Sequence, residues 1–508
     1  MKTRYTLALA ALLLASSCVE DTGNYTYEAP DAVAPVILSG LEASYEAISL
    51  EQLVIDPEMK EDGDHFEYAW YAYPINHTAI PYDTIGRARK LDYTVTIPSG
   101  TYTLIFKATD KRHGTSVYQR TQLSVSSIFG KGYYVNKSEN GRGDVDFIDR
   151  NGTLHPNLLK QVNGDDLPGT AVRSAYVSNK YYYETTDAAG VTTRLLAQPA
   201  FLFCTDQDMR VYHGDNMNLL KSWDEAFLEV PAVKRPQGVW ATGGGFMLMN
   251  DNALHFIHNN GYTVGQFGYH FPSGDYRYAA QAAIGSSGCC VFDENAGTFL
   301  GYYPAHNTPY TDVYPAYVGH NYVNQELLWL GSRHFYDISS TNAYAIIRDK
   351  GDDAVRVFTL WPHYIQSNLF VFETEYLINP GIGIGDGKVF TCHGGGNVST
   401  ISAGHPVIYY STGDNRVHYY NLANQIERRD AVTLPADERV VYIHHAYDYY
   451  YQVNIFSILA EKNGNWKLYT HDMVGSTPDI QATPAATYSG TGTPVNLIYR
   501  HPDTKLTY

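Results

Sequence analysis

A repeated hairpin pattern constrains this chain more than any other feature. In the stretch Pro406–Leu422 (PVIYYSTGDNRVHYYNL), two apolar, aromatic and β-branched runs flank a polar cluster that contains Gly413 and Asp414. A cluster of this kind between two such runs is typical of a β-hairpin. Similar hairpins open at Tyr133, Phe201, Phe246, Cys289, Tyr344, Val407, Ile455 and Leu497. Their mean step of about 52 residues suits the four-stranded blade of a propeller.

The strands of these hairpins are apolar on both faces. Tyr344–Ile347 and Phe246–Met249 show no alternation between apolar and polar residues, which a one-sided sheet would require. A propeller blade is covered on both faces by its neighbours, so we predict an all-β fold in which residues 128–508 form a seven-bladed β-propeller. The terminal hairpin from Leu497 is expected to share one blade with the hairpin from Tyr133. An eight-bladed ring and a β-sandwich stay open as alternatives.

The N-terminus is typical of a secreted lipoprotein. Lys2 and Arg4 precede a short apolar run, Leu7–Ala15, which is followed by Ser16, Ser17 and Cys18. The run is too short to span a bilayer. We therefore predict that residues 1–17 are a signal peptide, that Cys18 accepts a lipid, and that residues 18–33 form a polar tether. An uncleaved or ordinary signal peptide is the alternative.

A smaller β module is expected over residues 34–127. Short strand patterns succeed one another here, and Trp70 lies in the apolar run Phe66–Tyr71. The runs Tyr102–Asp110 and Ser116–Val125 flank a turn that contains Gly114. About seven short strands with a Trp placed for the core indicate an immunoglobulin-like sandwich.

Four segments resemble the PKD-like lipoprotein family of Bacteroidetes: Phe66-x-Tyr-x-Trp70, Gly100-x-Tyr-x-Leu104, Thr121–Val125 and Gly132–Val135. The acidic pair Glu20 and Asp21 after Cys18 resembles the tag that sends such lipoproteins to the outer face of the outer membrane. The resemblance implies an accessory role beside a SusC-like TonB-dependent transporter and a SusD-like lipoprotein in nutrient uptake. It brings no catalytic residues with it.

Composition narrows the classes of ligand. The formal net charge of −17 disfavours nucleic acid, whose phosphates would be repelled. Cys204, Cys289, Cys290 and Cys392 lie in or beside apolar strand patterns, so we expect them to fill the core, although disulfides stay open. Cys289 and Cys290 should point to opposite faces of one strand.

Several polar clusters suggest catalysis at first sight, but the spacing argues against it. His444 and His445 are adjacent and would face opposite ways on a strand, and His255 and His258 could share a face only on a helix. The run from Cys392 through His393 to Asn397 has neither the third group of a catalytic dyad nor the following helix of a phosphate loop. We therefore predict no metal site, no cofactor and no enzymatic activity.

Aromatic side chains are the expected ligand contacts. The Pro- and Gly-broken segment 301–322 holds six tyrosines, and Tyr presents a rigid face and a hydroxyl to sugars or peptides. The candidate binding residues are Tyr302, Tyr303, Tyr310, Tyr314, Tyr317, Tyr322 and Trp361. Packing between blades is the competing role for these rings. We predict a non-enzymatic surface subunit that binds oligopeptide or glycan, with a glycan- or peptide-cleaving propeller and a purely structural scaffold as alternatives.

Overall fold

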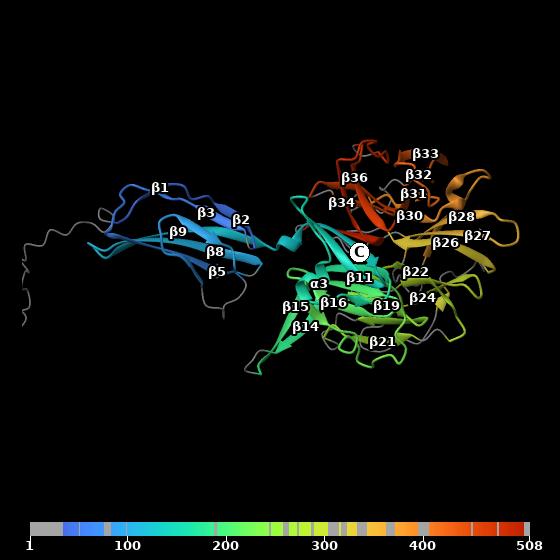
Figure 1. Cartoon of the computed structure of the whole chain (residues 1–508), viewed down its shortest axis with the longest axis horizontal. Coiled ribbons are helices and arrows are strands. Elements are labelled where there is room, and N and C mark those ends of the chain that lie inside the picture. Colours follow the sequence, from blue (N-terminus) through green and yellow to red (C-terminus); the bar gives the residue numbers. More distant parts are fainter. Residues whose placement is uncertain are drawn as a thin grey trace, which may run out of the picture. The chain divides into compact units, whose positions relative to one another are not determined.

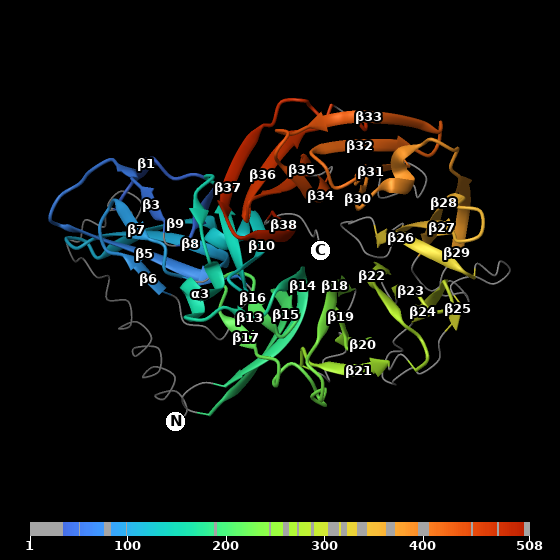
Figure 2. The ribbon, with the colours of Figure 1, turned by 45° about the vertical axis from the view of Figure 1, so that its right-hand side comes forward.

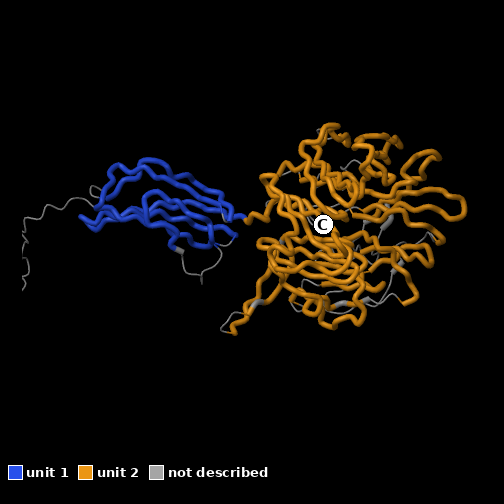
Figure 3. The backbone as a smooth tube through the Cα atoms, viewed as in Figure 1, with its two compact units in different colours: residues 1–126 blue, residues 127–508 orange. Residues whose placement is uncertain are grey.

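The computed structural model describes sixteen stretches of the chain, and all statements below refer to them. They are residues 34–49, 51–75, 83–97, 99–186, 190–242, 245–257, 264–271, 274–285, 289–302, 314–315, 323–332, 343–361, 371–394, 406–448, 451–474 and 477–501. The chain divides into two compact units, residues 1–126 and 127–508 (Figure 3). This boundary lies one residue before the end predicted for the N-terminal module.

Unit 1 is a small β module. Its strands are β1 (Ile37–Ser39), β2 (Ser44–Ile48), β3 (Gln52–Ile55), β4 (Glu58–Met59), β5 (Phe66–Pro74), β6 (Asp83–Gly86), β7 (Leu91–Thr94), β8 (Gly100–Asp110) and β9 (Thr115–Ser126) (Figure 1). The order β2-β9-β8-β5-β6 forms the main sheet, and β3-β7 and β1-β4 form two smaller ones. Trp70 is fully buried as expected, and its indole N–H donates to the carbonyl oxygen of Ala88 at 3.0 Å.

Unit 2 begins with a short 3-10 helix, η1 (Ile128–Gly130), and then forms seven four-stranded blades. Blade 1 contains β38 (Thr493–Arg500), β10 (Gly132–Glu139), β11 (Arg142–Asp149) and β12 (Leu154–His155), with β13 (Leu167–Pro168) added to β11 and the helix α3 (Leu158–Asn163) between β12 and β13. Blade 2 contains β14 (Ala171–Thr186), β15 (Thr192–Thr205), β16 (Met209–His213) and β17 (Leu219–Lys221). Blade 3 contains β18 (Pro236–Thr242), β19 (Gly245–Asn250), β20 (Ala253–Ile257) and β21 (Phe267–Phe271). Blade 4 contains β22 (Tyr278–Ile284), β23 (Cys289–Asp293), β24 (Thr298–Tyr302) and β25 (Tyr314–Pro315).

The other three blades repeat the same order. Blade 5 contains β26 (Gln325–Ser332), β27 (Ala343–Asp349), β28 (Val355–Trp361) and β29 (Val371–Leu377). After the 3-10 helix η3 (Gly383–Asp386), blade 6 contains β30 (Val389–Cys392), β31 (Val407–Ser411), β32 (Arg416–Asn421) and β33 (Ile426–Thr433). Blade 7 contains β34 (Arg439–Asp448), β35 (Val453–Lys462), β36 (Asn465–Asp472) and β37 (Ala486–Thr491).

The blades close into a ring. The inner strands β38, β14, β18, β22, β26, β30 and β34 contact one another in that order, and β34 contacts β38 again. Figure 2 shows the blades following one another around a common centre. The predicted seven-bladed propeller is therefore confirmed.

Both faces of each blade are buried, as the strand pattern predicted. All six residues of β19 are buried: Phe246 and Leu248 pack against blade 2, while Met247 and Met249 pack against blade 4. Seven apolar clusters lie at the seven junctions between neighbouring blades. Burial of each large apolar side chain contributes roughly 1.5–3 kcal/mol, so these clusters are the main source of stability.

The ring closes differently from the prediction in one respect. Seven of the eight predicted hairpins are the second and third strands of the seven blades, but Leu497 does not open a hairpin of this kind. It lies inside β38, which becomes the inner strand of blade 1 by pairing with β10. The terminal segment does share a blade with the first hairpin, but it contributes a single strand within the described residues.

Buried polar contacts lock the closing strand. The Asn496 side chain of β38 accepts hydrogen bonds from Asn136 Nδ2 and from the Ser174 backbone N–H, both at 3.0 Å, so it joins β10 to β14. At the end of β38, the buried Arg500 guanidinium donates to Asp215 Oδ1 at 2.6 Å and to the carbonyl oxygen of Phe129 at 3.1 Å. These contacts connect residues more than 280 positions apart in the chain.

Candidate functional site

The predicted aromatic ligand surface is not built by Tyr302. This side chain is fully buried in the cluster between blades 3 and 4, where its hydroxyl bonds to the hydroxyl of Tyr278. A buried ring cannot stack on a ligand, so the packing role holds at this position and the binding role is wrong. Of the other candidates, Tyr314 lies in β25 and Trp361 in β28, with side chains outside the described set. Tyr303, Tyr310, Tyr317 and Tyr322 lie outside the described residues altogether.

The histidine and cysteine motifs have structural roles. His445 Nδ1 accepts the Gly394 backbone N–H at 2.9 Å, and its Nε2 lies 2.8 Å from Asn454 Oδ1, so this ring joins β34 to its neighbours. Cys204, Cys289, Cys290 and Cys392 are buried, as expected of core residues. Cys289 packs toward blade 3 and Cys290 toward blade 5, which confirms their opposite orientation. In the described stretches, no three His, Cys, Asp or Glu side chains converge as metal ligands would.

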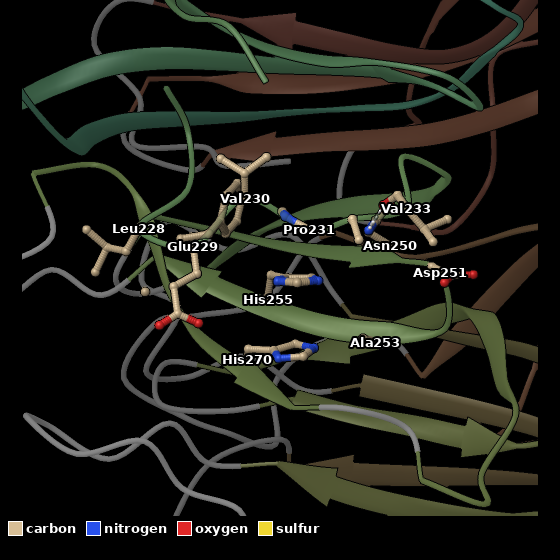
Figure 4. A pocket seen from close by; sticks show the side chains of 13 residues that line it. Leu228, Glu229, Val230, Pro231, Val233, Asn250, Asp251, Ala253, His255 and His270 are labelled. Carbon is tan, nitrogen blue, oxygen red and sulfur yellow. Dashed lines mark hydrogen bonds between the residues drawn. The ribbon is translucent and has the colours of Figure 1, made fainter. Parts of the chain in front are cut away.

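A pocket of about 680 Å³ lies on blade 3. Its walls come from β19, β20 and β21 and from the segment 228–233, which connects blade 2 to blade 3 (Figure 4). This volume falls within the range of small-molecule and peptide side-chain sites. The pocket is therefore the strongest candidate for a ligand site among the described residues.

Hydrogen bonds hold the segment 228–233 against the blade. The Leu228 backbone N–H donates to the carbonyl oxygen of Phe267 at 3.1 Å, so the segment adds to the β21 edge. At its other end, Asn250 Nδ2 donates to the carbonyl oxygen of Val233 at 2.9 Å. The wall is thus attached at both ends, which is the kind of preformed geometry that lowers the entropic cost of binding.

Two stacked imidazoles form the floor of the pocket. His255 of β20 and His270 of β21 are directly opposite in the antiparallel ladder, and their ring centroids lie 4.7 Å apart at an interplanar angle of 13° (Figure 4). The rings of His255 and Phe227 form a T-shaped pair, with their centroids 5.4 Å apart. From the sequence, His255 was expected only not to share a face with His258, and nothing pointed to His270, because only the strand pairing brings the two rings together.

Both imidazoles are neutral at physiological pH. Burial, and next the neighbouring His270, lowers the pKa of His255 to about 3. Burial also lowers the pKa of His270, while Glu229 opposes this change. A neutral imidazole has one N–H donor and one nitrogen acceptor, so the pair can both donate to and accept from an amide or hydroxyl group.

The rim of the pocket is apolar and acidic. Leu228, Val230 and Val233 are 56%, 49% and 46% exposed, which is unusual for aliphatic side chains that lie close together on one segment. Glu229 and Asp251 add carboxylates to the same rim. Such a surface suits a ligand that presents both apolar groups and hydrogen-bonding groups.

Fold and pocket together define the class of this protein: a PKD-like unit followed by a seven-bladed propeller that carries a preformed pocket. Residues 18–170 match the model of the PKD-like family. The match spans unit 1 and continues through β10–β13 of blade 1, where Gly132–Val135 also resembled the family. No curated protein matches the chain.

Solved structures show only distant likeness. A crystal structure of a quinonprotein alcohol dehydrogenase-like protein from Bacteroides thetaiotaomicron VPI-5482 is 12% identical, with a TM-score of 0.43, over 92% of this chain and 99% of that chain. A structure of an active polycomb repressive complex 2 in the basal state is 10% identical, with a TM-score of 0.34, over 74% of this chain and 70% of that chain. The propeller is established by the sheets themselves. No helix in the described residues combines the length and apolarity that crossing a membrane demands.

Proposed function

We propose that this protein is a surface-exposed lipoprotein that binds a nutrient ligand for a SusC/SusD-type uptake system and catalyses no reaction. Lipid on Cys18 would hold it in the outer membrane, facing the exterior. One lipid chain gives weak retention, so docking on the SusC-like transporter and the SusD-like lipoprotein would add avidity. The match of residues 18–170 to the PKD-like family supports this proposal, because the lipoproteins that the sequence resembles also carry a PKD-like domain.

The pocket of blade 3 is the observation that carries the binding role. Its exposed aliphatic side chains suit apolar groups of a ligand, and its neutral imidazoles suit amide groups. Sugars are most often held by stacking on aromatic faces, whereas Leu228, Val230 and Val233 are aliphatic. Between the two predicted ligands, the pocket therefore favours an oligopeptide over a glycan.

Ligand binding is tested with a charged substitution in the pocket wall. The full chain in detergent solution is incubated with a mixture of short oligopeptides and, separately, with a mixture of glycans, and retained and cleaved species are identified by mass spectrometry. We expect retained, uncleaved peptides, and at least tenfold weaker retention by Val230→Asp, because a carboxylate would be desolvated against apolar ligand groups.

Val191→Asp is the matched control, since Val191 is 58% exposed on blade 2, away from the pocket. Equal loss in both variants would contradict a role for the pocket. Cleavage products that depend on the protein would contradict a non-enzymatic role.

Location and partners need a separate experiment. In the source cells, the unaltered protein should incorporate labelled fatty acid and should be degraded when intact cells are treated with protease. The Cys18→Ser variant should incorporate no fatty acid and should be protected from the protease. Affinity capture of the unaltered protein should recover a TonB-dependent transporter and a SusD-like lipoprotein. A fatty-acid-free protein inside the cell, or capture without these partners, would contradict this part of the proposal.

A further inference from the structure

Arg173 lies at the inner edge of the propeller ring. It belongs to β14, the inner strand of blade 2, and its backbone pairs with Cys204 of β15. Its guanidinium carbon lies 5.2 Å from the centre of the Trp240 ring, which belongs to the inner strand of blade 3. Tyr442, on the inner strand of blade 7, is near enough to influence its charge. The Arg173 side chain therefore contacts the inner strand of blade 3 and lies within electrostatic reach of the inner strand of blade 7.

This cation has no anionic partner in the described structure. No ion pair or hydrogen bond involves its side chain, and the buried Nε atom has no acceptor. Arg500, on the neighbouring inner strand, also has a buried Nε without an acceptor, but its two terminal nitrogens donate to Asp215 and to two carbonyl oxygens. Arg173 is thus unlike the buried arginine that closes the ring.

No carboxylate of the described residues compensates the charge of Arg173. Partly exposed side chains on the nearest inner strands are all uncharged: Val495 on β38, Val441, Tyr442 and Tyr447 on β34, and Gln237 on β18. Burial lowers the pKa of Arg173, because the surroundings disfavour the charged form. An uncompensated cation in such a place is costly, so a stability role does not explain it. The residue is nevertheless only partly buried.

We propose that Arg173 binds the carboxylate group of a ligand at the inner edge of the ring. The planar guanidinium presents parallel N–H donors that match the two oxygens of a carboxylate. Trp240 supports the guanidinium through its ring face. This site is separate from the pocket of blade 3 and does not rest on the function proposed above.

Two sources of carboxylate fit this chemistry: the C-terminus of a peptide and an acidic sugar. The test is calorimetric titration of the full chain in detergent solution with N-acetyl-trialanine, N-acetyl-trialanine amide, trigalacturonate and maltotriose. We expect at least one carboxylate probe to bind while its uncharged counterpart does not. Binding of the peptide acid would identify a peptide C-terminus as the source of the carboxylate, and binding of trigalacturonate would identify an acidic sugar. Absence of binding by both carboxylate probes at 10 mM would overturn the proposal.

Variants test whether Arg173 is the contact. Arg173→Met should weaken the bound probe roughly tenfold or more, and Arg173→Lys, which keeps the charge but lacks the planar fork, should weaken it less. Arg277→Met removes the same charge from an exposed site, where the side chain is 71% exposed, and should bind as the unaltered protein does.

Stability supplies the second readout. Because Arg173→Met leaves no partner unsatisfied, its midpoint of urea unfolding should equal or exceed that of the unaltered chain. A lower midpoint, or unchanged probe binding in Arg173→Met, would overturn the proposal. Failure of these tests would not affect the proposed function of the blade 3 pocket, because that function is tested separately by peptide retention in Val230→Asp.

Discussion

The closing blade and blade 3 use buried polar groups in opposite ways. At the blade 1 seam, Asn496 joins two strands and Arg500 has three acceptors. Nearby, the fully buried Lys137 and Asp146 form an ion pair at 2.8 Å, and the Trp466 indole N–H donates to the same carboxylate at 2.8 Å. On blade 3, His255 and His270 contact each other as rings, and aliphatic side chains stay in solvent.

This difference separates stability from binding. A seam between strands that are distant in sequence needs specific, satisfied contacts, because the same apolar patterns recur in every blade and pack equally well elsewhere. A ligand site instead needs polar atoms and apolar area that the folded protein leaves available. Substitutions at the seam should therefore change unfolding, whereas those on the blade 3 rim should change binding.

The largest effect is expected from Arg500→Met. The variant removes the partner of Asp215 and leaves the carbonyl oxygen of Phe129 without this donor, so the free energy of unfolding should fall by about 3 to 4 kcal/mol. Urea unfolding followed by circular dichroism measures it. Arg277→Met, at an exposed site, should change it by less than about 0.5 kcal/mol. Equal effects in the two variants would mean that Arg500 does not secure the seam.

Asn496→Ala should have the next largest effect. Asn136 Nδ2 and the Ser174 backbone N–H would lose their acceptor inside the core, which costs about 2 to 3 kcal/mol of unfolding free energy. The same urea experiment checks this. Asn379→Ala is the matched control at an exposed position. A stable Asn496→Ala variant would show that the strand pairing of β38 closes the ring unaided.

His255 should make stability depend on pH. Because its folded pKa of about 3 lies below the ordinary 6.5, the unfolded chain binds the proton more readily between these values. Stability is therefore lost as pH falls below 6.5, by about 2 kcal/mol at pH 5. His255→Phe keeps a ring but removes this contribution, so the loss between pH 7 and 5 should shrink. His270→Phe, at an exposed position, should reduce this pH-dependent loss less than His255→Phe does. A larger reduction in His270→Phe would contradict the assignment of the loss to His255.

The smallest effect on stability is expected at the pocket rim. Leu228 is 56% exposed, so Leu228→Ser should change the free energy of unfolding by less than about 0.5 kcal/mol. Peptide retention, measured by mass spectrometry as above, should nevertheless fall. Asn496→Ala should behave in the opposite way: its free energy of unfolding should fall, but it should retain peptides as well as the unaltered protein does under conditions where it stays folded. If Leu228→Ser lowers stability as much as Asn496→Ala does, the distinction between seam and pocket is wrong.

Much of the architecture could be predicted because its signals are local. Turn residues such as Gly413 and Asp414 mark hairpins without reference to distant strands, and unbroken apolar runs such as Phe246–Met249 indicate burial on both faces. The burial of Trp70 and the opposite orientation of Cys289 and Cys290 were predicted from the same local patterns. The packing role of Tyr302 could not be predicted, because an aromatic residue before a Pro-rich segment has the same local pattern whether it packs in the core or binds a ligand.

Longer-range features had no local signal. Leu497 lies in an apolar run like those that open the hairpins, and only its pairing with Val135, across the whole propeller, makes it part of an inner strand. The facing of His255 and His270 depends on the register of β20 against β21. The blade 3 pocket was missed because its wall, the segment 228–233, comes from the connection between two blades.

The sequence by itself determined seven of the β-hairpins and the two-sided burial of their strands, because turn chemistry and side-chain alternation act over a few residues. Only the tertiary structure decided which strand closes the ring, which imidazoles stack and which arginine lacks a counter-ion. These properties depend on side chains that are far apart in the chain and meet only when seven blades surround one axis.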